Sequence, residues 1–131
     1  MAAVTAAARD ERANRYGEAS EGYERAAGQT GDEVVGRTAL YRAALTAEQA
    51  GESERAMGLY LALADGSPGT REAGRALYDA GRLAEREGRV DEALGHWRRL
   101  IREEPGSPMA EVAVRRLYQA YGERGTSRGQ A

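Results

Sequence analysis

The sequence predicts an all-α fold, a right-handed α-solenoid of three helix-turn-helix repeats followed by a C-terminal capping helix. The segment 39–63 returns at 76–100, a period of 37 residues, and such a fixed period is typical of repeat architectures. Alanine is abundant, β-branched residues are scarce and Pro occurs only three times, which favours helix. Gly51 and Gly88 stand at the same point of each period, where a helical hairpin is expected to turn.

Turn residues divide the chain into seven expected helices. Asn14 occupies the position that Gly51 and Gly88 hold later, and Asn tolerates the left-handed conformation that ends a helix. Thr30 with Glu33 has capping-box spacing, and Ser67 before Pro68 predicts an N-cap and a first helical residue. The expected helices cover about 2–14, 16–27, 32–50, 54–65, 70–87, 90–103 and 108–122.

Residue size predicts how the helices pack. Ala44 and Gly81 are expected to face Ala56 and Ala93 across their hairpins, because small residues allow close approach. Larger residues are expected to fill the space between hairpins, and these are Leu40, Leu77, Tyr60, Trp97, Leu63 and Leu100. Residues 1–123 are expected to form one repeat domain, and the polar, Gly-rich residues 124–131 a flexible tail.

Charge and composition restrict the function. The 19 basic residues, all Arg, are mixed with 21 acidic ones, so no basic stripe predicts nucleic-acid binding. The absence of Lys fits either a codon bias or bidentate contacts that Lys cannot make. No Cys is present, which excludes disulfides and thiolate metal sites.

No segment predicts a membrane span or a complete signal peptide. The cellular compartment stays open: cytoplasmic as the sequence stands, periplasm or cell envelope if an upstream signal or anchor was removed.

Catalytic patterns are absent from the sequence. His96 is the only histidine, and no metal-ligand spacing, phosphate-binding loop or nucleophile–base set can be assembled. The acidic pair Asp91-Glu92 is adjacent in sequence and therefore lies on different helical faces. We expect no enzyme, no cofactor and no metal site.

The repeat resembles the tetratricopeptide repeat (TPR) family. The residues that carry the resemblance in the third unit are Leu77, Gly81, Gly88, Ala93, Trp97, Leu100 and Pro105. In the second unit they are Leu40, Ala44, Gly51, Ala56, Tyr60, Leu63 and Pro68. The first unit matches only at Ala7, Ala19, Tyr23 and Ala26.

Two features depart from the family pattern. The period is longer than usual, and Ala47 and Ala84 stand where an aromatic residue is common. The long period, with the ending Pro105-Gly-Ser107, resembles the bacterial cell-envelope branch, which includes Tol-Pal coordination and outer-membrane assembly lipoproteins. A short stand-alone scaffold or a fragment of a longer array fits equally.

The resemblance implies a non-catalytic scaffold that binds a segment of another protein in a concave groove lined by the first helix of each pair. The partner-binding positions carried over are Tyr41, Glu48, Gln49, Arg75, Tyr78, Arg82, Arg86, Arg115 and Tyr118. Tyrosines flanked by arginines suit a peptide that carries carboxylates. Tyr41 and Tyr78 are equally explained as packing residues, and Arg82 and Arg86 as members of surface ion pairs.

Other functions stay open at this point. They are a self-assembling structural module, a ligand- or peptide-sensing regulatory domain of a larger protein, and a secretion-type chaperone. The expected partner is a protein or peptide segment, acidic where it meets the arginines, with a homo-oligomer as the alternative.

Overall fold

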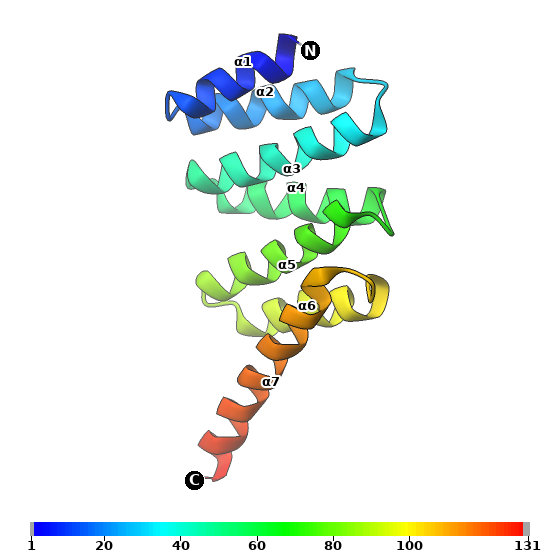
Figure 1. The fold of residues 1–131 in the computed structure, drawn as a ribbon. Helices are drawn as coiled ribbons and strands as arrows, with labels where there is room; N and C mark the ends of the chain where they lie inside the picture. Colours follow the sequence, from blue (N-terminus) through cyan, green and yellow to red (C-terminus); the bar gives the residue numbers. More distant parts are fainter. Residues whose placement is uncertain (1, 130–131) are drawn as a thin grey trace. The chain divides into compact units, whose positions relative to one another are not determined.

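The computed structural model describes the backbone of residues 2–129 and the side chains of residues 2–122. Within this part the chain forms only helices (Figure 1), and the predicted all-α helical repeat fold is confirmed. The seven helices are α1 (Ala2–Arg12), α2 (Tyr16–Gln29), α3 (Glu33–Gln49), α4 (Ser53–Gly66), α5 (Arg71–Arg86), α6 (Val90–Glu103) and α7 (Pro108–Gly129).

The turns inside the three hairpins share one backbone device. Asn14, Gly51 and Gly88 all have positive φ values, of 63°, 81° and 80° respectively. A left-handed residue lets the chain reverse directly after a helix, and Gly or Asn adopts that conformation most readily. The expectation that Asn14 replaces a turn glycine is therefore confirmed.

Two predicted helix caps are wrong. The N-cap of α3 is Asp32, whose carboxylate accepts from Val35 N–H (3.0 Å), whereas Thr30 ends α2. The N-cap of α5 is Thr70, whose hydroxyl accepts from Ala73 N–H (3.2 Å). Ser67 does not cap α5, because Gly69 turns with a φ of 81° and delays the helix to Arg71.

The second Ser-Pro pair does begin a helix. Pro108 is the first residue of α7, and the Ser107 hydroxyl accepts from Met109 N–H (3.1 Å). The helix continues to Gly129, beyond the end predicted at Gly122, because Gly122 keeps a helical backbone. The side chains of the predicted tail and residues 130–131 lie outside the described residues.

The chain divides into two compact units, residues 1–67 and 68–131. In the first unit α1 pairs with α2 and α3 with α4, and α2 packs directly on α3. A set of polar contacts joins α2, α3 and α4. Ser20 of α2 is fully buried and donates to the Ala43 carbonyl of α3 (2.7 Å). Arg55 of α4 contacts Ser20 and pairs with Glu24 of α2 (2.6 Å). The two hairpins of this unit are thereby fastened to each other.

In the second unit α6 packs on α5, and α7 packs on both. Glu104, directly after α6, is only 7% exposed. Both its carboxylate oxygens lie close to Gly69 N–H, at 2.6 and 3.1 Å. This contact ties the end of α6 to the turn that precedes α5.

The cores consist mostly of alanine with a few large residues. Ala56 and Ala93 are fully buried, as expected. The expectation that Trp97 fills the space between hairpins is wrong, because a Cβ at Gly81 of the same hairpin would lie 2.2 Å from Nε1 of Trp97. Trp97 therefore packs inside its own hairpin, and Gly81 is small in order to admit the indole ring.

Candidate partner-binding surfaces

A pocket of about 350 Å³ opens in the first unit between α1 and α3. Both are first helices of their hairpins, the elements on which the sequence places the partner-binding positions. The pocket is lined by Ala8, Glu11, Arg12, Tyr16, Tyr23, Arg42 and Gln49. Of the three positions predicted in this unit, only Gln49 lines it.

A glutamate–tyrosine hydrogen bond recurs in the two hairpins of this unit. Tyr23 donates to Glu11 (2.8 Å), and Tyr60 donates to Glu48 (2.9 Å). Both bonds join the two helices of one hairpin, and their members are separated by the 37-residue period. Glu48 thus has a role in holding its own hairpin together.

Burial raises the pKa of Tyr23 to about 12, with further contributions from the hydrogen bond and the charge of Glu11. Only 5% of Tyr23 is exposed, and removing a phenol from water disfavours its charged form. Tyr23 therefore remains a neutral hydrogen-bond donor at the floor of the pocket over the physiological pH range.

The charges around the pocket favour an anionic group. Glu11, which already accepts from Tyr23, has its second oxygen 3.6 Å from Nη1 of Arg42. Arg12 is exposed and makes no hydrogen bond or ion pair with any described residue. The pocket is thus lined by two guanidinium groups and by one carboxylate that is already engaged, and guanidinium is well suited to bind carboxylates.

Tyr41 does not line the pocket but contacts Tyr60. Its ring is half-buried, with its centroid 6.1 Å from that of Tyr60. The packing interpretation of this tyrosine is therefore supported by its contact. The sequence reasoning missed Arg12, although shifting Gln49 back by one period of 37 residues leads to it.

On α5 in the second unit, the predicted arginines have intramolecular partners. Arg82 lies 3.3 Å from Asp79, a carboxylate that is only 8% exposed. Arg75 and Arg86 are exposed on the same helix, and both take part in further interactions. Tyr78 is half-buried, and its carbonyl accepts from the indole N–H of Trp97 (3.3 Å).

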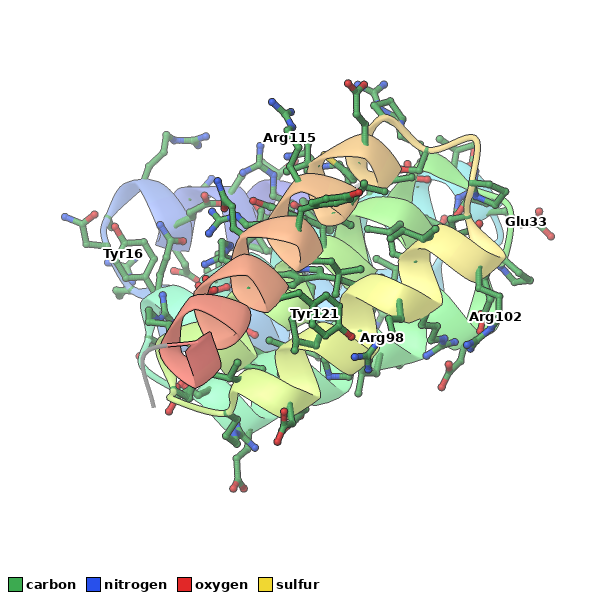
Figure 2. All side chains as sticks on the ribbon, turned by 90° about the horizontal axis from the view of Figure 1, so that it is seen from below. Tyr16, Glu33, Arg98, Arg102, Arg115 and Tyr121 are labelled. Carbon is green, nitrogen blue, oxygen red and sulfur yellow. The ribbon has the colours of Figure 1, made fainter. Side chains whose placement is uncertain are left out.

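The remaining predicted positions are on α7. Arg115 is exposed without a hydrogen bond or ion pair among the described residues, and Figure 2 shows its side chain extending away from the helix. Tyr118 is 78% exposed. It lines an apolar groove of about 330 Å³ together with Ile101, Val114, Leu117 and Tyr121.

The predicted residues are thus distributed over three local environments. One is the α1–α3 pocket, the second is the ion-paired surface of α5, and the third is the apolar groove of α7. That the whole set acts as one binding surface stays a prediction.

Metal clusters and membrane-spanning helices are two further features that the described residues can be checked for. Within residues 2–122, no group of three His, Asp or Glu side chains could hold a metal ion. None of the helices described here combines the length and the apolarity needed to cross a membrane.

Comparison with protein families identifies the repeat. The tetratricopeptide repeat model matches residues 38–70 and again residues 75–107, which together are half of the chain. The chain belongs to the tetratricopeptide repeat family. TPR units are generally non-catalytic modules for protein–protein interaction. A comparison with characterised proteins found no match.

The first hairpin lies outside the residues matched by the TPR model, but it shares the geometry of the matched ones. Its turn residue Asn14 has the same left-handed conformation as Gly51 and Gly88. Its Tyr23–Glu11 hydrogen bond is equivalent to Tyr60–Glu48 one TPR unit later. The structure therefore adds α1 and α2 as a TPR-like unit of weaker sequence signature.

Proposed function

We propose that this chain is a non-catalytic TPR scaffold that binds an acidic segment of a partner protein. The observation that carries the proposal is the α1–α3 pocket, which Arg12 and Arg42 line together with Tyr23 and Ala8. Neutral tyrosine and apolar surface supply contact area, and the guanidinium groups supply the attraction for carboxylates. Gln49 at the rim offers an amide that can pair with a peptide backbone.

The other positions predicted from the sequence are also proposed as partner contacts. In the first unit these are Tyr41 and Glu48, which also contact Tyr60 of their own hairpin. In the second unit the proposed contacts are Arg75, Tyr78, Arg82, Arg86, Arg115 and Tyr118. Among these, Arg115 offers the charge that no described carboxylate neutralises.

The finer family assignment belongs to this proposal as well. The period of 37 residues and the ending Pro105-Gly-Ser107 support the cell-envelope branch of the family. In that branch the partner segment would belong to another envelope protein. The family match itself supports only the coarser statement that the partner is a protein.

Affinity capture with charge-reversed variants tests the function. The parent protein and Arg12→Glu/Arg42→Glu are used as baits in extracts of the source organism, with mass spectrometry as the readout. We expect specific prey proteins to be lost with the double variant and kept with Arg71→Glu, which reverses an exposed charge at the start of α5. Recovery of the same proteins at the same yield with the double variant would remove the pocket from the function.

Arg82 is unsuitable for charge reversal. Arg82→Glu would place a second carboxylate beside the buried Asp79. Such a variant loses stability as well as a surface charge, so a loss of binding would not be interpretable. Arg12 and Arg42 are exposed and have no buried acidic partner.

A further inference from the structure

The apolar groove between α6 and α7 is a second surface, separate from the pocket of the first unit. Three of its side chains are unusually open to solvent for their type: Tyr118 at 78%, Tyr121 at 46% and Val114 at 40%. Leu117 and Ile101 complete the groove. Grouped exposed apolar side chains on a small protein are typical of interaction sites.

The repeat register indicates what kind of element covers such a face. Moving back by 40 residues, Leu117 corresponds to Leu77, Tyr118 to Tyr78 and Tyr121 to Gly81. On α5 this face is covered by α6, because Trp97 stands directly over Gly81 and donates to the Tyr78 carbonyl. No described helix covers the corresponding face of α7. The groove therefore resembles the face of a hairpin's first helix without its second helix.

Residue size restricts which helix can lie there. A Cβ at Gly81 would be 2.2 Å from Trp97, and a Cβ at Gly74 would be 2.2 Å from the Ser107 hydroxyl. On α7 the corresponding residues are Tyr121 and Val114, both large. A helix with a tryptophan at the position of Trp97 would therefore collide with Tyr121, and the occupant must carry a small residue there.

Charge restricts the occupant further. Arg98 lies on the α6 side of the groove, where it donates to the Tyr121 hydroxyl and has its guanidinium carbon 5.5 Å from the centroid of that ring. No described carboxylate pairs with Arg98. Arg102, one turn further along α6, shares Glu103 with Arg99. Figure 2 shows Arg98 and Tyr121 meeting between the two helices.

The opposite side of the groove is electrically balanced. Glu111 and Arg115 are both exposed on α7, and neither has a partner among the described residues. The net positive side is thus the α6 side. Acidic residues on the edge of an occupant helix that faces α6 would therefore favour its binding.

We propose that the α6–α7 groove is a docking site for an amphipathic helix of another protein, with a small residue opposite Tyr121 and acidic residues along the edge that faces Arg98. The partner would complete a hairpin with α7, as α6 does with α5. Its apolar stripe would cover Val114, Leu117 and Tyr118, in the manner of helix-in-groove recognition.

A second copy of this chain suits the groove less well. The groove itself offers a second copy only Arg98 as a charge without a described carboxylate, and no acidic side chain to match it. The exposed side of α1 is rich in small residues but carries Arg9 and Arg12, which have the same sign as Arg98. Like charges across an interface suppress association.

Labelled peptides copied from α6 test the proposal. The acidic probe contains residues 90–103 with Trp97→Ala, Arg98→Glu, Arg99→Glu and Arg102→Glu, and fluorescence anisotropy measures its binding to the full chain. We expect binding to the parent protein, and a dissociation constant at least about tenfold weaker for Val114→Asp. The matched control is Val90→Asp, since Val90 is 41% and Val114 40% exposed; it should bind as the parent does.

Two further arms test size and charge. The same probe with Trp97 retained should bind the parent about tenfold more weakly than the Trp97→Ala probe. With the Tyr121→Gly protein, the probe that retains Trp97 should be the tighter binder. The Arg98→Glu protein should bind the acidic probe more weakly than the parent does. It should bind more tightly a probe that keeps its arginines. If circular dichroism shows that Tyr121→Gly loses helix in α7, the Val114→Asp and Arg98→Glu variants still test the docking site.

Several results would overturn the proposal. One is the absence of binding by any probe at about millimolar concentration, the weak end of specific recognition. Another is equal binding to the parent and Val114→Asp. A third is a concentration-dependent dimer, seen by light scattering and abolished by Val114→Asp, because a second copy would then be the occupant. Arg12→Glu/Arg42→Glu should not alter probe binding, so this test can fail independently of the function proposed above.

Discussion

Gly81 and Trp97 are fitted to each other, and their pair differs from its counterpart in the preceding repeat. The corresponding positions there are Ala44 and Tyr60. The larger indole ring in one hairpin is matched by the smaller residue opposite, where even a methyl group would be 2.2 Å from the ring nitrogen. Such size exchange between facing positions is how closely packed cores keep their density.

We expect Gly81→Ala to lower the free energy of unfolding by about 1–3 kcal/mol, because the buried indole cannot move away. Urea denaturation followed by circular dichroism gives this value. Gly95→Ala is the control, since a Cβ there meets nothing, and it should stabilise the helix by about 0.5–1 kcal/mol. Adding Trp97→Tyr to Gly81→Ala recreates the pair of the second repeat and should recover most of the loss. A double variant as unstable as the two single changes combined would contradict the pairing.

The ionisation of Tyr23 makes the stability of the protein depend on pH in the alkaline range. Its pKa of about 12 lies above the value of about 10 expected in the unfolded chain. Between these values the unfolded chain has lost the proton and the native state has kept it, so stability falls as pH rises from about 10 to about 12. Over that range the parent should lose up to about 2.7 kcal/mol more than Tyr23→Phe.

Denaturation curves at several pH values measure this difference, with Tyr16→Phe as the control tyrosine. At neutral pH, Tyr23→Phe also loses the hydrogen bond to Glu11, which is worth about 1 kcal/mol. Parallel pH profiles for the parent and Tyr23→Phe would show that Tyr23 titrates normally.

At the scale of elements, a few polar side chains join helices to their neighbours. Glu104 is the clearest case, because its buried carboxylate accepts from Gly69 N–H in the turn before α5. Arg55 has a similar part in the first unit through Ser20 and Glu24. Neither contact recurs at the corresponding position of another repeat, so each is particular to its place in the chain.

Glu104→Ala should lower the free energy of unfolding by about 1.5–3 kcal/mol, the range for hydrogen bonds to charged groups. Amide exchange at Gly69 and in the first turn of α5 should accelerate at the same time, as seen by hydrogen–deuterium exchange. Glu104→Gln keeps an acceptor and should lose less. The neighbouring Glu103→Ala serves as control, because Arg99 and Arg102 engage that exposed carboxylate only at the surface, and it should change stability by less than about 0.5 kcal/mol.

At the scale of the whole molecule, mixed charge governs which macromolecules the chain attracts. Its net charge is −2, with acidic and basic residues interspersed. The guanidinium groups of Arg12, Arg42 and Arg98 near the two candidate surfaces are therefore local features on a weakly acidic protein. Attraction to an acidic peptide depends on a few arginines, whereas binding along a nucleic-acid backbone needs a continuous basic surface.

We expect no binding of a duplex DNA oligonucleotide by fluorescence anisotropy at about physiological salt, where non-specific DNA binding is already weak. The Arg12→Glu/Arg42→Glu variant, with its more negative charge, serves as the comparison. DNA binding by the parent that disappears in this variant would reassign the α1–α3 pocket to nucleic acid.

The sequence by itself determined the repeat. The period of 37 residues, the positions of Asn14, Gly51 and Gly88, and the alanine-rich composition predict the hairpins and the helical fold correctly. Local chemistry suffices for this, because a left-handed turn residue and a helix-forming composition act over a few neighbouring residues.

Only the tertiary structure decided what individual side chains contact. It assigned Glu48 to Tyr60, placed Trp97 over Gly81, moved the cap of α5 to Thr70 and brought Arg12 beside Arg42. These outcomes depend on groups that are distant in sequence, and helical periodicity specifies a face without naming the residue that meets it. The pocket and the α7 groove follow from such long-range contacts, and for that reason the sequence alone could not place them.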